Sequence, residues 1–210
     1  MDIKIVSVNA LSEGAEMLLT ISLSCGEGRV EKRRLLMFTE QYLELGLSKG
    51  MMLDEVTFDK LEENSRRCKA MKKGSDLLSY SASSERRLAQ RLKSKGIDKE
   101  SAEFAASKLK AMGVINEELD VERAVNTCLK KLWGKKRIYR ELCAKGYERE
   151  YISSALDEVD DDVLAQNCKT LFKKKYKSLP TDPAEQKKIV AALVRYGYSF
   201  SQIKYAMQTK

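Results

Sequence analysis

Short segments of the first eighty residues alternate apolar and polar positions with a period of two. Residues 3–8 (IKIVSV) and 17–23 (MLLTISL) are rich in β-branched or aliphatic side chains, and RVEKRRLLMF follows Gly26 and Gly28. Successive side chains of a strand point to opposite faces of a sheet. The pattern therefore predicts two or three antiparallel strands, with a hairpin turn at the two glycines.

The pattern then changes to helical spacing. A short helix is expected in the segment TEQYLELGLSKGMML, ending at Gly46 or Gly50, and a charged helix from about residue 54 to 71. The next segment, KKGSDLLSYSASS, is rich in glycine and serine. A junction is therefore expected near residues 74–84.

From Ser84 onward, one arrangement of apolar residues and glycine occurs three times. Two apolar residues four positions apart are followed, after four more, by glycine and a further apolar residue, and then by two more apolar residues. The glycines lie 50 and then 51 residues apart, so this is an internal repeat. The three copies are Leu88, Leu92, Gly96, Ile97, Ala102 and Ala106; Ile138, Leu142, Gly146, Tyr147, Ile152 and Leu156; and Ile189, Leu193, Gly197, Tyr198, Ile203 and Met207.

Each copy predicts two helices joined at the glycine. Apolar residues four apart share one helix face, and glycine readily adopts the left-handed conformation that ends a helix. Asp182 before Pro183 is expected to start the first helix of the third copy, and Ser199 with Gln202 to cap its second. Residues 118–133 and 161–176 also have helical apolar spacing, so each predicts one more helix, assigned here to the end of the preceding unit.

The expected fold is mostly α: tandem three-helix repeats in an elongated, curved array, after a small N-terminal domain of two or three strands plus helix. The expected divisions are residues 1–76 for that domain, 77–133 for the first repeat, 134–178 for the second, and 179–210 for a truncated third repeat of two helices. Neighbouring repeats are expected to complete one another's cores.

Charge is distributed unevenly along the chain of 210 residues, whose net charge is +8. Residues 1–80 carry a net charge of −1 and residues 81–210 carry +9. This asymmetry favours an acidic partner, either nucleic acid or an acidic protein surface. The five cysteines are widely spaced, no apolar run reaches the roughly 18 residues of a membrane span, and no secretory signal is recognisable. A cytoplasmic monomer without membrane contact is expected.

The sequence contains no histidine, which removes the commonest general base and metal ligand. It also has no phosphate-binding glycine loop and no clustered cysteine pair. We therefore expect a protein that is not an enzyme and that needs no cofactor or metal.

Two basic clusters are the candidate binding residues. The first is Lys130, Lys131, Lys135, Lys136, Arg137 and Arg140, and the second is Lys169, Lys173, Lys174, Lys175 and Lys177. Both are expected at equivalent places in the repeat, and few carboxylates stand among them, Glu141 being the nearest to the first. A solvated helix face is the alternative explanation for each cluster. Trp133 is expected to pack at a module junction rather than to stack on a base.

The helix–glycine–helix units also resemble helix-turn-helix modules, whose second helix enters the major groove. A direct DNA-binding protein is therefore the alternative function. Against it, the expected second helix EREYISSALDEV carries Glu148, Glu150, Asp157 and Glu158, which phosphates would repel.

GKKRIYRELCAKGYEREYISSAL resembles the central signature of the RecX family of recombinase regulators. The matching residues are a glycine with basic residues, an isoleucine, a Glu-Leu pair and a Lys-Gly turn: Gly134, Lys135, Lys136, Arg137, Ile138, Glu141, Leu142, Lys145 and Gly146. LLSYSASSERRLAQRLKSKGI and LVRYGYSFSQIKYAM resemble the family's first and third repeats. The resemblance covers about residues 77–210.

The resemblance implies a bacterial cytoplasmic protein that lies along the RecA filament on single-stranded DNA and inhibits or destabilises it. Such a protein modulates recombination and the SOS response. Contact with single-stranded DNA is expected to be weak or to occur through the filament. The basic residues Lys130, Lys131, Lys135, Lys136, Arg137, Arg140, Lys173, Lys174 and Lys175 are the expected contact edge.

Overall fold

The computed structural model describes residues 2–25, 29–176 and 179–208, in two compact units. The first unit comprises the chain up to Ser81 together with Leu88–Val114, and the second comprises Ala82–Arg87 with the chain from Ile115 onward. Most described residues are helical, and the strands are confined to the N-terminal part, as the sequence predicts. No helix within these ranges is long and apolar enough to cross a bilayer.

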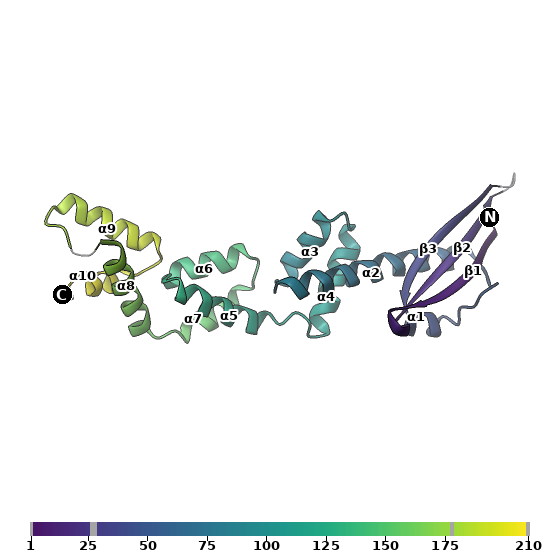
Figure 1. The fold of residues 1–210 in the computed structure, drawn as a ribbon, viewed down its shortest axis with the longest axis horizontal. Helices are drawn as coiled ribbons and strands as arrows, with labels where there is room; N and C mark the ends of the chain where they lie inside the picture. The colour runs from purple at the N-terminus through teal and green to yellow at the C-terminus, as the bar shows by residue number, and fades with distance from the viewer. Residues whose placement is uncertain (1, 26–28, 177–178, 209–210) are drawn as a thin grey trace. The chain divides into compact units, whose positions relative to one another are not determined.

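The first unit begins with an antiparallel sheet of strand order β3-β2-β1-β4 (Figure 1). Its strands are β1 (Asp2–Leu11), β2 (Glu16–Cys25), β3 (Arg29–Phe38) and β4 (Met52–Leu53), with α1 (Thr39–Glu44) between β3 and β4. The three long strands confirm the period-two prediction, while β4 was not predicted because two residues carry no periodicity. The proposed turn at Gly26 and Gly28 lies outside the described residues.

One face of this sheet packs against the long helix α2 (Glu55–Tyr80). Alternate strand residues such as Ile5, Leu19, Ile21 and Met37 are fully buried beside Leu61 of α2. Asp54 caps the helix by accepting a hydrogen bond from the Thr57 N–H at 2.7 Å. This alternation of buried and exposed strand positions is what a sheet covered on one side requires.

Helix α2 runs nine residues past Met71, where the sequence placed its end. Gly74, expected as part of a junction, lies inside the helix and contacts the leucines of α3 (Glu85–Ser94) and α4 (Lys99–Ala111). A Cβ at Gly74 would lie 2.8 Å from the Leu109 side chain and 3.6 Å from Leu88. The glycine therefore permits close helix packing here and does not end the helix.

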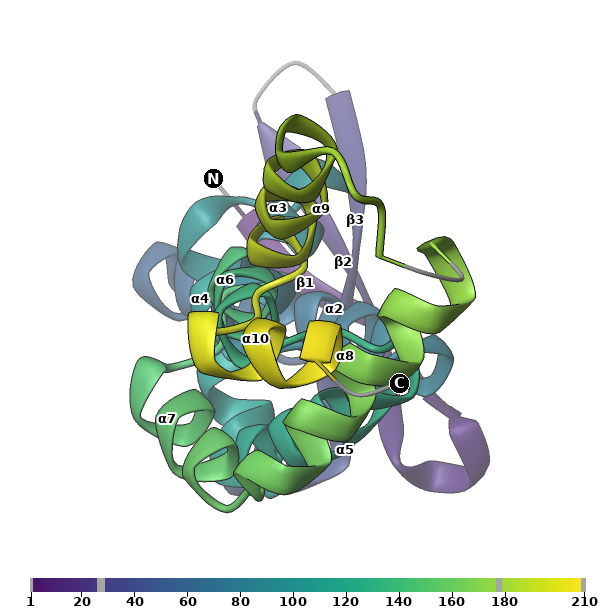
Figure 2. The same ribbon diagram turned by 90° about the vertical axis from the view of Figure 1, so that its left-hand side faces the viewer.

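The second unit contains two cores, each built from three consecutive helices. The first core joins α5 (Glu117–Lys130), α6 (Lys135–Ala144) and α7 (Arg149–Asp157), and the second joins α8 (Asp161–Tyr176), α9 (Pro183–Arg195) and α10 (Phe200–Gln208). Figure 2 shows α8, α9 and α10 as one bundle at the front of the view. Each long helix thus packs with the pair that follows it, whereas the sequence analysis assigned it to the pair before, and the last core has three helices where two were expected.

The repeat positions lie where the periodicity placed them. Leu88, Leu92, Ile138, Leu142, Ile189 and Leu193 are all buried, and Gly96, Gly146 and Gly197 all have positive φ angles, of 85°, 83° and 97°. After each glycine the next residue donates its N–H to the carbonyl five residues back, for example Tyr198 to Leu193 at 3.3 Å. This is the bond of a glycine-terminated helix end. The predicted caps also form, since Asp182 accepts from Ala184 N–H and Ser199 and Gln202 cap each other reciprocally.

Two buried thiols predict a loss of stability at alkaline pH. Burial raises the pKa of Cys68 to about 11 and that of Cys168 to about 12, and it raises the pKa of the Tyr198 phenol as well. An unfolded thiol ionises near 8.5. Above about pH 9 the unfolded chain therefore releases protons that the folded chain retains, so the free energy of unfolding falls as pH rises, by up to roughly 1.4 kcal/mol per pH unit for each thiol.

Urea unfolding at pH 8, 9 and 10 measures this loss. The slope against pH is expected to decrease in the Cys168→Ala variant, even though that variant is also less stable at every pH because a core side chain is shortened. A free energy of unfolding that stays constant from pH 8 to 10 would contradict the assignment.

Candidate partner-binding site

The candidate site lies where the start of α6 meets the end of α9. The N–H of Gly134 donates to the Tyr196 carbonyl at 2.8 Å, and the N–H of Lys136 donates to the Gly197 carbonyl at 3.2 Å. Gly134 and Gly197 are both buried here, with their backbones in direct contact. The carboxyl end of one helix therefore caps the amino end of another, which is the favourable arrangement of two helix dipoles.

A related contact occurs one repeat earlier. Ser84 precedes α3 as Gly134 precedes α6, and its hydroxyl donates to the Lys145 carbonyl at 3.1 Å. Lys145 stands directly before Gly146, as Tyr196 stands before Gly197. The glycine turn of one repeat thus receives the helix start of the repeat before it in both cases. The difference is that a side chain makes the contact at Ser84, whereas the backbone makes it at Gly134.

The first turn of α6 consists of Lys135, Lys136 and Arg137, without any acidic residue. Positive charge at the amino end of a helix opposes the helix dipole, whose positive pole lies there. Lys173, Lys174 and Lys175 occupy the last turn of α8, where the dipole favours them. Helix stability therefore explains the cations of α8 but not those at the start of α6.

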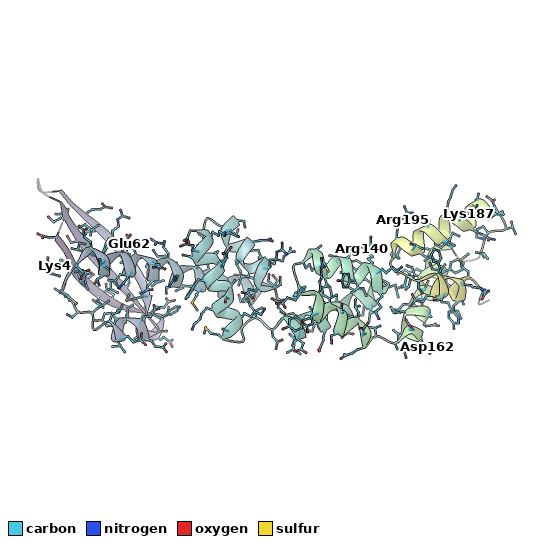
Figure 3. The ribbon with its side chains drawn as sticks, turned by 180° about the vertical axis from the view of Figure 1, so that it is seen from behind. Lys4, Glu62, Arg140, Asp162, Lys187 and Arg195 are labelled. Atoms are coloured by element: carbon cyan, nitrogen blue, oxygen red, sulfur yellow. The ribbon has the colours of Figure 1, made fainter. Side chains whose placement is uncertain are left out.

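Lys135, Lys136 and Arg140 line a cleft of about 700 Å³ between α6, α7 and α9. The cleft also contains Arg195, the last residue of α9, and its walls include Tyr139 and Val194. Figure 3 labels Arg140 and Arg195 and shows their two side chains where α6 and α9 face each other. Four cations from two helices thus converge on one hollow.

One carboxylate enters this group from another helix. Asp157, the last residue of α7, pairs with Lys135 at 3.0 Å between Oδ1 and Nζ. Near-neighbour carboxylates are scarce in the sequence, but folding brings Asp157 across 22 positions. Lys136, Arg140 and Arg195 form no ion pair with a carboxylate in the described ranges.

Lys135 and Lys136 also line a second cavity, of about 840 Å³, on the side towards α8 and α10. Its other lining residues include Asp161, Asp162, Ser199 and Gln202. The positive region at the start of α6 is therefore bordered by carboxylates.

Three of the nine cations of the expected contact edge lie over aromatic rings, and Lys169 of the second cluster lies 6.0 Å from the centroid of Tyr205. The Arg137 guanidinium lies 4.1 Å from the centroid of Trp133 and 5.0 Å from that of Tyr196. Lys131 lies 5.4 Å from Trp133, and Lys175 lies 4.4 Å from Tyr196. Cation–π contacts of this kind stabilise a packed junction. Trp133 is therefore a junction residue, as expected, and Arg137, which lies over both Trp133 and Tyr196, joins the two cores.

Tyr196 has a perturbed phenol at this place. Its pKa is lowered, first because Lys175 donates a hydrogen bond to the phenol oxygen at 2.7 Å, and further because Lys175 and Arg137 are positively charged. The two cations thus favour negative charge on the ring oxygen.

The other three cations of the expected contact edge, Lys130, Lys173 and Lys174, are exposed and line neither cavity. The nine residues named from sequence therefore divide into three sets of three. One set lines the cleft, one stacks on aromatic rings, and one faces solvent. Lys177 lies outside the described residues.

Arg195 and Tyr196 belong to the site although no sequence pattern predicted them there. Arg195 is isolated among apolar residues in AALVRYGY, so no charge run marks it. Their position in the repeat was the signal available, because Tyr196 directly precedes the turn glycine of the third copy and Arg195 stands one residue earlier.

The pattern that defines the RecX third three-helix domain matches residues 161–207. These residues include α8, α9 and all but the last residue of α10, three helices that share one core in the structure. The regulatory protein RecX of Clostridioides difficile is 28% identical over 170 residues, covering 80% of each chain. That of Listeria innocua is 29% identical over 168 residues, covering 76% of this chain and 61% of that protein. The RecX of Caldanaerobacter subterraneus is 35% identical over 83 residues, or 40% of this chain and 42% of that one.

Two crystal structures share the fold. One is that of a regulatory protein RecX and superposes with a TM-score of 0.76, covering 96% of this chain and 98% of its own, at 23% identity. The other is RecX from Lactobacillus salivarius, with a TM-score of 0.59, covering 67% of this chain and 94% of its own, also at 23% identity.

Proposed function

Because the chain belongs to the RecX family, we propose that it regulates the RecA recombinase by binding the RecA filament on single-stranded DNA and inhibiting or destabilising it. In this proposal the chain has no enzymatic activity and acts by contact alone. The observation that carries the proposal is the cleft at the α6–α9 junction, where Lys135, Lys136, Arg140 and Arg195 converge.

The chemistry of the cleft supports binding over catalysis. Lysine and arginine are charged at neutral pH, so they hold anionic groups but exchange no protons there. Arginine in particular pairs with carboxylates and phosphates through two parallel hydrogen bonds. A partner with an acidic surface is therefore the ligand that this cleft suits.

Repetition of the unit supports a filament as the partner. A filament offers the same surface many times, and a chain of repeated helical units can contact it at more than one place. Linked weak contacts reinforce one another through effective concentration, provided that they can be made simultaneously. Modest affinity at each unit would then suffice for stable binding.

ATP hydrolysis by RecA on single-stranded DNA provides the test. At saturating concentration the chain is expected to slow hydrolysis at least tenfold and to sediment with the filament. Binding to the filament is expected to be much tighter than binding to the same DNA without RecA. Unchanged hydrolysis together with failure to sediment would refute the proposal.

Direct DNA binding is the second candidate function, favoured by the net charge of +9 over residues 81–210. Helix α7, which would take the place of a recognition helix, carries two carboxylates, the exposed Glu150 and the cleft residue Asp157, which phosphates would meet unfavourably. Tight binding to duplex DNA without RecA would favour this candidate. Its affinity should then fall with salt at a logarithmic slope of about 0.9 for each phosphate contacted.

A further inference from the structure

We infer that the cleft between α6, α7 and α9 binds a short acidic peptide segment of the recombinase. One apolar side chain of this segment enters the cleft, and the carboxylates that flank it in the peptide pair with the cations around the cleft. This inference rests on the proposed function and specifies the chemistry of the partner at that site. It concerns the cleft of about 700 Å³ and not the exposed basic residues elsewhere.

The walls of the cleft are apolar. Leu156 lines it with a side chain only 2% exposed, and Tyr139 and Val194 line it as half-buried residues. A phosphodiester chain would gain little from two aliphatic walls, whereas a leucine or phenylalanine side chain would lose water-exposed apolar surface there. The apolar part of the site therefore favours a peptide.

Cations surround these walls on both sides. Arg140 comes from α6 and Arg195 from α9, and Lys136 lies beside them. Lys135 is partly neutralised by Asp157, but the other three pair with no described carboxylate. Carboxylates that flank an apolar side chain would meet guanidinium groups from two directions, which suits paired hydrogen bonds.

Carboxylates limit the size of the anion that the region can accept. Asp157 lies in the cleft itself, and Asp161 and Asp162 line the neighbouring cavity beyond Lys135 and Lys136. A single strand of DNA that continued past the cleft would bring its phosphates towards these carboxylates and be repelled. A compact acidic segment fits between them, so nucleic acid is the less suitable ligand.

A side chain of α7 allows the cleft to be filled without changing any charge. Ser153 is exposed and lines the cleft, whereas its exposed neighbour Ser154 does not. Serine and tryptophan have similar helix propensities, so the Ser153→Trp and Ser154→Trp variants should both fold. Ser153→Trp is expected to weaken binding to the RecA filament at least tenfold. Ser154→Trp should bind as the natural chain does, and both variants should bind oligothymidylate equally.

A peptide probe tests the cleft without RecA. An acetylated Glu-Glu-Leu-Glu-Glu peptide is expected to shift the methyl resonances of Val194 and Leu156 in the natural chain but not in Ser153→Trp. The same peptide with lysine for glutamate should leave them unchanged.

The two experiments distinguish failure of this inference from failure of the proposed function. Equal filament binding by the natural chain and Ser153→Trp would overturn the inference and leave the proposed function standing. Oligothymidylate that shifts the same methyl resonances and binds Ser153→Trp more weakly would also overturn it, in favour of nucleic acid. If the natural chain bound no filament but the acidic peptide still shifted the methyl resonances, the proposed function would fail and the peptide chemistry of the cleft would stand.

Discussion

Replacing Gly197 with alanine is expected to destabilise the second unit by roughly 2–5 kcal/mol. The residue has φ of 97°, a conformation that costs an alanine about 1–2 kcal/mol. Its new Cβ would also lie 2.6 Å from the Gly134 carbonyl oxygen and 2.7 Å from the Arg137 Cβ. Relieving such a collision costs roughly 1–3 kcal/mol more, because backbone atoms cannot rotate away. Urea unfolding followed by circular dichroism measures the loss.

Gly146→Ala is the matched control. Gly146 holds the same place in the repeat, with φ of 83°, but its nearest neighbour is the Ser84 side-chain oxygen at 3.1 Å, which can move. The Gly146→Ala variant should therefore lose only the stability that the positive φ costs an alanine, about 1–2 kcal/mol. Gly134 has a φ of −85°, which alanine adopts readily, so the Gly134→Ala variant should lose only the stability that the backbone collision costs, roughly 1–3 kcal/mol. Trp133, the only tryptophan in the sequence, should change its fluorescence in Gly134→Ala and Gly197→Ala. Equal losses in Gly197→Ala and Gly146→Ala would show that the backbone contact is unimportant.

Reversing Lys135, Lys136 and Arg140 to glutamate is expected to lower affinity for the RecA filament at least a hundredfold. The change replaces three of the four cations of the cleft with groups that repel an acidic segment and Asp157 alike. Arg137 is left intact because it lies over Trp133 and Tyr196, and its loss would also weaken the junction. Affinity is measured by fluorescence anisotropy of labelled chain added to preformed filament.

The control for this triple variant is the reversal of Lys130, Lys173 and Lys174. It lowers the net charge from +8 to +2, as the cleft variant does, but these residues are exposed and line neither cavity. It should therefore lose less than tenfold in affinity. If both triple variants lost affinity equally, attraction between overall charges would explain binding and the cleft would have no particular role.

The sequence determines the helices and their buried faces well, for physical reasons. Apolar residues four apart at Ile138 and Leu142, followed by Gly146, leave little choice but a helix that ends at the glycine. The grouping of helices was not predictable in the same way. A helix such as α8 has one apolar stripe, and that stripe can pack on the pair before it or the pair after it. In the structure Cys168 of α8 shares one buried core with Leu193 of α9, so the stripe packs on the pair that follows.

The contacts that each cation makes in the folded chain could not be predicted from the sequence either. Lys135, Lys136 and Arg137 are consecutive, and the first two border both cavities, yet only Lys135 pairs with Asp157 and only Arg137 lies over two rings. These differences depend on residues far away in the sequence. Asp157, which pairs with Lys135, is 22 positions away, and Gly197, which accepts the Lys136 N–H, is 61 positions away. A run of positive charge therefore indicates an edge worth testing but does not identify the residues that bind.

Strand β3 lies at the edge of the sheet, with β2 as its strand neighbour. An exposed edge can recruit a strand from another chain and so begin aggregation. Two features oppose this. Near its end, Leu36 donates its N–H to the Ser65 hydroxyl of α2 at 2.9 Å, so that part of the edge is already occupied. Near its start, the consecutive charges of Glu31, Lys32, Arg33 and Arg34 would crowd any incoming strand. The charges of this strand and its bond to α2 thus oppose pairing of the edge with another chain, a role that needs no partner.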